Sequence, residues 1–168
     1  MTKPLFLDKL KLNRDLIWGL VNDYGQQANE KLLREDVVSK VYNNYLTEIS
    51  KHHSVPVMDH EIRKFLNVVP VNGVILDVGG CWGWHWRSLK KLRPDVRVVI
   101  CDLIRENLLY AQSILNNLII DKQIFLVHGN AISLDFNNNT FDAVWSIQTT
   151  QHIPDIRQAF REIYRVLK

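Results

Sequence analysis

The 168-residue sequence has little cysteine: only Cys81 and Cys101 are present, too few for a disulfide framework or a cysteine-based zinc site. No stretch reaches the roughly 18 consecutive apolar residues of a membrane-spanning helix. The amino-terminal region carries scattered charges and lacks the apolar segment of a secretory signal. We therefore expect a protein that works in a reducing cytoplasm.

The sequence also lacks a strong excess of either charge. Its 21 Lys and Arg residues against 18 Asp and Glu residues give a net charge of +3, and the basic residues are dispersed. No motif typical of nucleic-acid recognition accompanies them, so a nucleic-acid partner is not predicted. The hydrophobic share of 46% is high enough to exclude a disordered chain and to supply a core.

Residues 1–70 show the spacing of amphipathic helices. Apolar residues from Leu16 to Tyr24 predict one helix, and a longer series predicts a second over residues 32–49. Pro56 disfavours helix at Val55, so residues 52–60 are expected to form a loop before a short third helix around residues 62–66. We interpret residues 1–70 as a helical segment that covers a cleft in the domain that follows.

Residues 71–168 alternate between short β-branched runs and helical stretches. The expected strands are Val74–Val78, Val96–Cys101, Ile124–Val127 and Ala143–Ile147, and the final helix covers residues 156–167. Strands that alternate with helices predict βαβ units, and hence an α/β fold with a mostly parallel sheet and right-handed crossovers.

A glycine-containing turn follows the first of these strands and leads into a helix. This layout is typical of a nucleotide-type cofactor site at the carboxyl edge of a sheet. Gly79 and Gly83 would let the backbone approach a ligand where a Cβ would collide. The dinucleotide fingerprint fails, because Cys81 and Trp84 stand where glycines are needed, and no Gly-Lys-Ser/Thr exists. Binding of a pyrophosphate, and with it an NAD-dependent oxidoreductase, is disfavoured.

Several motifs occur in the order found in one enzyme family. They are Asp77-Val78-Gly79-Gly80-Cys81-Trp82-Gly83 after the first strand, Asp102 after the second, Gly129-Asn130-Ala131 after the third, Phe141 to Ser146 at the fourth, and Gln151 to Asp155 with Phe160 to Lys168 beyond it. Residues 74–168 thereby resemble the class I S-adenosylmethionine-dependent methyltransferases. The resemblance implies a Rossmann-like sheet with the four strands in the order 3-2-1-4.

The resemblance also implies S-adenosylmethionine as cofactor and methyl transfer to a small or medium-sized acceptor with an oxygen, nitrogen or carbon nucleophile. The residues that it places at the cofactor are Asp77, Gly79, Gly80, Cys81, Trp82, Gly83, Asp102, Leu103, Asn130, Ala131 and Ser146. A non-catalytic module built on the same fold is the alternative, and Cys81, which stands where the family usually has a glycine, favours it.

Two carboxylates are the strongest individual candidates. Asp102 follows Asp77 by one turn, one helix and one strand, which places its carboxylate beside the glycine turn, able to accept hydrogen bonds from ribose hydroxyls. A helix cap is the competing role for Asp102. Asp77 lies within an apolar strand, so it must be hydrogen-bonded either to the amides of the glycine turn or to the ligand.

Aromatic and histidine residues give weaker signals. One of Trp82, Trp84 and Trp86 could shield the cofactor's sulfonium, although core packing is favoured for Trp86. His152 follows the fourth strand, where it could act as general base, and a structural role is the alternative. We interpret His52, His53 and His60 as surface residues rather than metal ligands. Candidate contacts to the acceptor, by position alone, are Tyr24, Tyr42, Tyr45 and Arg63.

The resemblance ends at Lys168, whereas the family normally continues into further strands. We therefore expect the fourth strand to be an edge strand and the last helix to expose apolar residues such as Ile156 and Phe160. Such a chain would be a fragment of a longer protein, or would self-associate or bind a partner chain across that edge.

Overall fold

The computed structural model describes residues 3–21, 25–32 and 54–168. The chain divides into two compact units. One contains Met1–Val21 together with Val69–Lys168 and is called the sheet unit below; the other is Asn22–Val68. Residues up to Val21 thus group with the sheet, whereas the sequence had suggested that they belong to a helical segment of residues 1–70.

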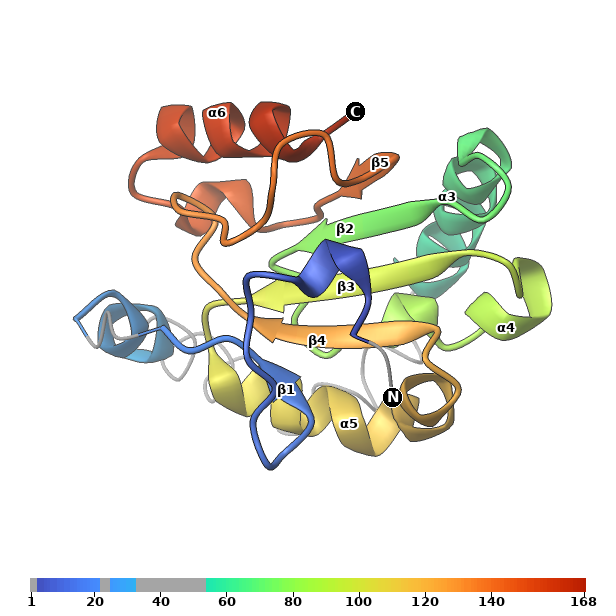
Figure 1. The fold of residues 1–168 in the computed structure, drawn as a ribbon, viewed down its shortest axis with the longest axis horizontal. Coiled ribbons are helices and arrows are strands. Elements are labelled where there is room, and N and C mark those ends of the chain that lie inside the picture. The colour runs from blue at the N-terminus through green and yellow to red at the C-terminus, as the bar shows by residue number, and fades with distance from the viewer. Residues whose placement is uncertain (1–2, 22–24, 33–53) are drawn as a thin grey trace. The chain divides into compact units, whose positions relative to one another are not determined.

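The sheet has five parallel strands in the order β1-β4-β3-β2-β5 (Figure 1). Their bounds are β1 Ile17–Trp18, β2 Val74–Val78, β3 Arg97–Asp102, β4 Ile124–His128 and β5 Ala143–Trp145. The last four are the strands expected from the sequence, and their arrangement confirms the order 3-2-1-4. All side chains of β2 and β4 are buried, which explains why these strands are apolar except at Asp77 and His128.

The sheet unit also contains helices and single 3-10 turns. They are η1 Leu5–Leu7, η2 Trp84–Trp86, α4 Leu89–Leu92, α5 Arg105–Ile120, η3 Thr150–His152 and α6 Ile156–Val166. The helix expected after the glycine turn is therefore only a 3-10 turn and a four-residue helix. The carboxylate of Asp155 caps α6, since it accepts the backbone N–H of Gln158 at 2.9 Å.

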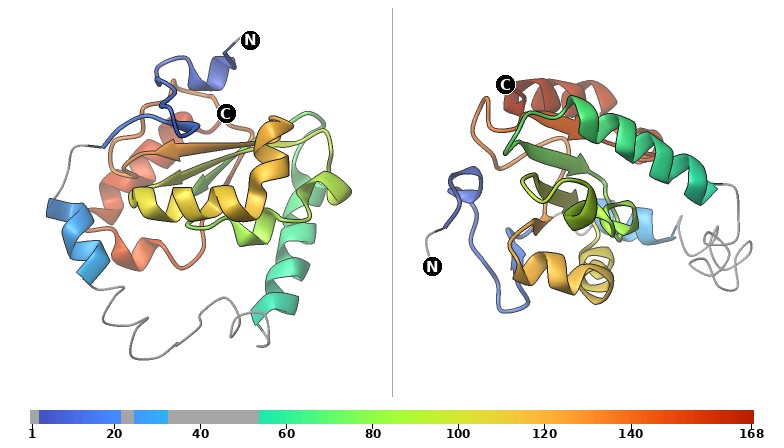
Figure 2. Two further views of the ribbon diagram at one scale, coloured as in Figure 1. Left: turned by 90° about the horizontal axis from the view of Figure 1, so that it is seen from below. Right: turned by 90° about the vertical axis from the view of Figure 1, so that its right-hand side faces the viewer.

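Two layers bury the two faces of the sheet. On one face, alternate side chains of β2, β3 and β4 pack in one core with η1, with residues 134–141 and with Val166 at the end of α6. On the other face α5 runs along β3 and β4, burying Leu108, Ala111 and Leu115. In the left view of Figure 2, η1 and α5 lie on opposite sides of the strands. This packing fixes the carboxyl ends of β2, β3 and β4, where the glycine turn lies.

The helix predicted over Leu16 to Tyr24 is wrong in its described part. Ile17 and Trp18 form β1, which pairs with Leu126 and Val127 of β4. Leu16 has a φ of 60° and Gly19 a φ of 77°, and neither angle is compatible with a right-handed helix. The strand provides hydrogen-bond partners for the otherwise unpaired edge of β4. These hydrogen bonds between segments far apart in the sequence outweigh the local preference for a helix that the apolar spacing indicates.

The second unit contains helical residues 25–32 and helix α3, Ser54–Val68. The break predicted at Pro56 is wrong, because Pro56 lies in the first turn of α3, where its missing N–H would have had no partner within the helix. His60 is accordingly helical rather than in a loop. Of the helix expected over residues 32–49, only Leu32 lies among the described residues, and it is helical. Among the residues that the structure describes, no helix is long and apolar enough to cross a membrane.

Candidate functional site

The glycine turn, residues 79–83, folds back against the end of β3. Gly79 donates its backbone N–H to the carbonyl of Cys101 at 2.7 Å, and Gly83 closes the turn onto the carbonyl of Gly80 at 2.8 Å. Three of its residues, Gly79, Cys81 and Gly83, have left-handed backbone angles, with φ of 69°, 53° and 59°. The turn is therefore tight, and it needs glycine-like freedom at every second residue.

The protein's own side chains fill the space that each glycine leaves. A Cβ on Gly79 would lie 2.1 Å from Cγ2 of Thr149, and one on Gly80 would lie 2.2 Å from Oδ2 of Asp77. A Cβ on Gly83 would lie 2.4 Å from Cδ1 of Ile100. The sequence had attributed Gly79 and Gly83 to close approach of a ligand, whereas in this structure close packing of the turn already requires them.

Asp77 is fully buried, and its partners differ from those expected. Its Oδ2 accepts hydrogen bonds from Nε1 of Trp86 at 2.7 Å and from Nε2 of His85 at 2.9 Å, rather than from amides of the turn. Oδ1 is buried too, and no described residue hydrogen-bonds to it. A buried carboxylate oxygen without a donor is costly, so this atom is suited to a ligand that brings a donor.

The three tryptophans around the turn lie in different surroundings. Trp86 is fully buried, which confirms the core role favoured for it. Trp84 lies beneath the guanidinium of Arg87, 3.3 Å from the ring centre, in a cation–π contact. Trp82 is half-buried and meets Tyr110 of α5 edge-on, with ring centres 5.2 Å apart. Trp82 is thus the tryptophan that belongs to the turn itself.

Asp102 ends β3 beside the turn, as predicted. Its Oδ2 accepts the backbone N–H of Cys81 at 2.9 Å, and its Oδ1 accepts from the N–H of Ile104 at 2.8 Å and from Nδ2 of Asn107 at 2.9 Å. Ile104, not Asp102, is the N-cap residue of α5. Asp102 therefore does not cap this helix; its carboxylate instead binds residues at the start of the helix, Ile104 and Asn107. The side chain is 4% exposed.

The two cysteines both lie near the carboxylates of Asp77 and Asp102, but they differ in exposure to solvent. Cys81 is half-buried in the turn, and Cys101 is buried in β3. Burial, reinforced by the nearby carboxylates of Asp102 and Asp77, raises the pKa of the Cys101 thiol far above its usual range. Cys101 therefore stays a neutral thiol and packs as an apolar side chain.

Asn130 and Ala131 follow β4 at the same edge of the sheet. Oδ1 of Asn130 accepts the N–H of Ile132 at 3.2 Å, which forms a turn within the segment. Ala131 is partly buried against the core. Leu103, the residue after Asp102, accepts a hydrogen bond through its carbonyl from Nε2 of the buried His128 at 3.0 Å.

His128 is a residue that the sequence did not single out. Its Nδ1 accepts the N–H of Val21 at 3.3 Å, so one imidazole links the amino-terminal segment, the end of β4 and the residue after Asp102. Burial is the main cause that lowers its pKa, which favours the neutral ring. Only its place at the last position of a strand, next to Gly129, could have drawn attention to it.

The loop after β5 contributes contacts to the turn. Ser146 donates to the carbonyl of Val78 at 3.0 Å, and Thr149 donates to the carbonyl of Gly79 at 3.3 Å. Thr149 was not predicted, since its contact with Gly79 is long-range and no local motif marks it. His152 lies in η3, exposed to solvent, with its Nε2 3.2 Å from Nε2 of Gln151.

The remaining candidates fall outside the sheet unit or outside the described residues. Tyr24, Tyr42, Tyr45, His52 and His53 are outside the described residues. Arg63 is part of α3, in the other unit. In the described parts of the chain, no three His, Cys, Asp or Glu side chains are grouped closely enough to hold a metal ion.

The arrangement favours a ligand rich in hydrogen-bond donors. Two buried carboxylates, Asp77 near the end of β2 and Asp102 at the end of the adjacent strand β3, both contact the turn or its flanking residues. Carboxylates repel phosphate but accept hydrogen bonds from hydroxyl and ammonium groups. The negative charge at this edge of the sheet therefore disfavours a pyrophosphate and suits groups that donate hydrogen bonds.

Comparison with known proteins agrees with this chemistry. A family model described as "Methyltransferase domain" matches residues 76–168. Demethylmenaquinone methyltransferase of Lactiplantibacillus plantarum is 35% identical over 98 residues, which are 58% of this chain and 41% of that protein. Cycloartenol-C-24-methyltransferase of Arabidopsis thaliana is 32% identical over 152 residues, 90% of this chain and 39% of that protein.

A solved structure from Methanococcus maripaludis, assigned to the S-adenosylmethionine-dependent methyltransferases, is similar in fold. It superposes with a TM-score of 0.65 at 25% identity, covering 74% of this chain and 57% of that one. The chain spans about two fifths of the length of the two curated relatives above.

Proposed function

Because the chain belongs to the methyltransferase domain family, whose model matches residues 76–168, we propose that it binds S-adenosylmethionine and takes part in transfer of its methyl group. The observation that carries the proposal is the hydrogen bond from Cys81 N–H to Asp102, which fixes the glycine turn beside a strand-end carboxylate. The cofactor supplies an activated methyl group on a sulfonium when it is bound.

The described residues fit the cofactor. Asp102 is proposed to accept hydrogen bonds from the ribose hydroxyls, and Leu103, Asn130 and Ala131 to border the adenine. The residues proposed for the methionine end are Asp77, Gly79, Gly80, Cys81, Trp82, Gly83 and Ser146. The buried Oδ1 of Asp77, which no described residue satisfies, is suited to a donor such as an ammonium group.

The protein's contribution to the reaction is positioning. Methyl transfer proceeds in line from donor to nucleophile, so a rigid turn that orients the cofactor and excludes water supplies most of the catalysis. The close packing of Gly79 on Thr149 and of Gly83 on Ile100 gives the turn this rigidity. His152 is proposed as a candidate base for a protonated acceptor, and an unchanged kcat in the His152→Ala variant would assign it a structural role.

The acceptor is proposed to be a small or medium-sized molecule. The name of the Arabidopsis relative specifies methylation at a carbon, which supports a carbon nucleophile here. We also propose that the protein acts in a reducing compartment, since Cys81 and Cys101 are not joined in a disulfide. Partner binding across β5 is a further proposal, supported by Phe160 of α6, which is 55% exposed as expected, whereas Ile156 is half-buried.

Calorimetry with S-adenosylhomocysteine tests the cofactor, and transfer of a labelled methyl group into a cell extract tests the activity. Binding with transfer is the expected result. Binding without transfer would favour the alternative of a non-catalytic module. Absence of binding, with NADH binding in a fluorescence titration instead, would overturn the proposal.

A further inference from the structure

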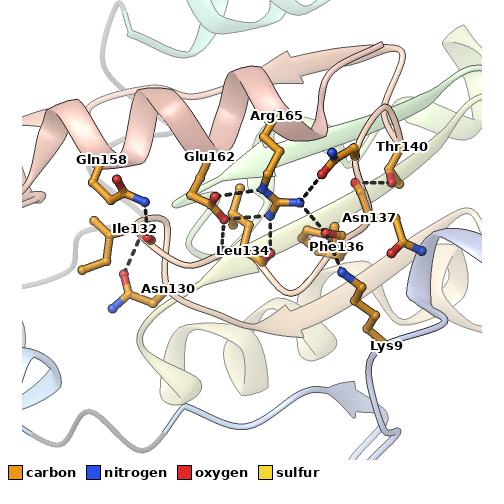
Figure 3. A network of polar contacts seen from close by, with 11 residues as sticks. Lys9, Asn130, Ile132, Leu134, Phe136, Asn137, Thr140, Gln158, Glu162 and Arg165 are labelled. Atoms are coloured by element: carbon orange, nitrogen blue, oxygen red, sulfur yellow. Dashed lines mark hydrogen bonds and ion pairs between the residues drawn. The ribbon is translucent and has the colours of Figure 1, made fainter.

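Helix α6 holds the segment that follows β4 by a dense set of polar contacts (Figure 3). This segment, residues 130–138, is called the post-β4 segment below; it begins with Asn130 and Ala131. Arg165 donates to the carbonyls of Leu134 and Phe136, each at 2.7 Å, and to Oδ1 of Asn138 at 3.0 Å. One side chain thus binds three residues of the segment.

Glu162 completes a two-residue clamp with Arg165. The guanidinium donates two hydrogen bonds to the carboxylate, at 2.8 and 2.7 Å, and Oε2 of Glu162 accepts the backbone N–H of Leu134 at 2.8 Å. The hydrogen bonds from Arg165 lower the pKa of Glu162, so the pair is fully charged at neutral pH. Both the N–H and the carbonyl of Leu134 are therefore held by α6.

The contacts continue toward Asn130. Nε2 of Gln158, one turn before Glu162, donates to the carbonyl of Ile132 at 3.4 Å. The N–H of Ile132 donates to Oδ1 of Asn130 at 3.2 Å. The polar face of α6 therefore reaches Asn130 through a single residue, as Figure 3 shows.

The post-β4 segment has little regular structure to fix it otherwise. Its one ladder contact is an isolated bridge between Asn130 and Ser133. Leu134 and Phe136 are buried in the core, and Phe136 meets Phe141 edge-on at 4.9 Å. Apolar burial holds the far end of the segment, while the direction of its backbone carbonyls is set by Arg165, Gln158 and, at 3.4 Å, Lys9.

We propose that the Glu162–Arg165 clamp is a positioning device for the adenine end of the cofactor site. It fixes the post-β4 segment so that Asn130 and Ala131 keep the conformation that borders the adenine. The inference rests on the proposed function, because it assumes that this end of the site binds an adenosine group. Neither clamp residue is expected to contact the cofactor itself.

The test compares two arginines with matched partners. Arg165→Lys keeps the charge but loses the fork that binds Glu162 and two carbonyls. Arg93 makes an equivalent set, with two hydrogen bonds to Asp95 at 2.9 and 2.8 Å and one each to the carbonyls of Val69 and Pro70 at 3.0 Å, before the start of β3. Arg93→Lys is the matched control, since it lies at the opposite end of the strands from the glycine turn.

The probes are S-adenosylhomocysteine and 5′-methylthioadenosine, which lacks the amino-acid group, both measured by calorimetry at a temperature where each variant is folded. Arg165→Lys is expected to raise the Kd of both probes by about tenfold, the scale of one well-formed hydrogen bond. Arg93→Lys is expected to change neither Kd. An equal loss for both probes places the defect at the adenosine end.

The possible outcomes separate the two hypotheses. If the unmodified protein binds neither probe, the proposed function fails. If it binds both, but Arg165→Lys binds them as tightly as the unmodified protein does, the clamp proposal is overturned. It is also overturned if Arg93→Lys weakens binding as much as Arg165→Lys does. Should Arg165→Lys not fold, Glu162→Gln keeps an oxygen for the N–H of Leu134 but breaks the paired hydrogen bonds with Arg165, and the same weakening of both probes is expected; an unchanged Kd would contradict the proposal.

Discussion

Asp102 holds Cys81 in a left-handed conformation: the carboxylate at the end of β3 accepts the backbone N–H of a non-glycine residue with a φ of 53°. Residues other than glycine rarely adopt this angle, because the Cβ approaches the following carbonyl. The hydrogen bond to a charged acceptor offsets that strain. The contact therefore both shapes the turn and keeps Asp102 beside it.

Replacing Cys81 with glycine is expected to stabilise the protein. The left-handed angle costs a non-glycine residue about 1–2 kcal/mol, and part of the gain is lost because glycine is more flexible in the unfolded chain. Urea unfolding should show a free energy of unfolding raised by about 0.5–1 kcal/mol. Cys81→Val, with its branched Cβ, should lower it; a stabilising valine would show that the turn relaxes to another conformation.

Gly79→Ala is expected to destabilise the protein by at least about 2 kcal/mol, from the left-handed angle and from collision with Thr149. Thr149→Ser removes the methyl group that lies nearest to the new Cβ. Thermal unfolding of both single variants and the double variant measures their coupling. The double variant should recover part of the loss, whereas strictly additive effects would argue against the contact.

Trp86→Phe removes the indole donor from the buried carboxylate of Asp77. Loss of a hydrogen bond to a charged group costs about 1.5–3 kcal/mol, in addition to the space left behind. Urea unfolding of Trp86→Phe, of Asp77→Asn and of the double variant measures the coupling between the indole and the carboxylate. The double variant should lose clearly less than the sum of the two single losses; a loss equal to that sum would mean that packing, not the hydrogen bond, dominates.

His128 is expected to make stability fall as the solution becomes acidic. Burial lowers its pKa from the ordinary 6.5, so below pH 6.5 the unfolded chain takes up a proton that the folded chain does not. Stability is therefore full above pH 6.5 and decreases as the pH falls toward the folded pKa. Protonation of Nδ1 would also remove the acceptor of Val21 N–H.

Urea unfolding at pH 7.5 and pH 5.5 checks this dependence. His128→Gln should be less stable at pH 7.5 but lose less stability between the two values than the unmodified protein. His152→Gln, at an exposed position, serves as the control and should retain the full loss. The pKa values of Asp142 and Glu162 are lowered from ordinary values of 3.8 and 4.5, so these two carboxylates affect stability mainly at a lower pH than His128 does. An undiminished loss in His128→Gln would assign the effect to another group.

The features that could be predicted from sequence are those with a local pattern. The parallel strands from β2 to β5 are continuous apolar runs, and Asp102 stands at the end of one of them. Strand β1 could not be foreseen, since two residues are too few to show alternation and their neighbours fit a helical spacing. Its stability comes from β4, which is distant in sequence.

The same distinction applies within the site. The glycines were identified, but the side chains that require them, such as Thr149, are brought close only by the fold. Asp77 was expected to need partners, yet sequence could not choose between backbone amides and the His85 and Trp86 side chains. Glu162 and Arg165 belong to a motif, Phe160 to Lys168, that was identified in the sequence. Their contacts to Leu134 could not be predicted, because these contacts depend on how α6 packs.

Binding of S-adenosylhomocysteine to Asp102→Asn tests the central claim most directly. Asparagine keeps an acceptor for Ile104 but loses the charged oxygen beside the turn. Calorimetry should show binding weakened by about 1.5–3 kcal/mol, the value of hydrogen bonds to a charged acceptor. Asp121→Ala, at an exposed position after α5, should bind as the unmodified protein does. Equal affinity of a folded Asp102→Asn and the unmodified protein would contradict the assignment of this edge of the sheet as the cofactor site.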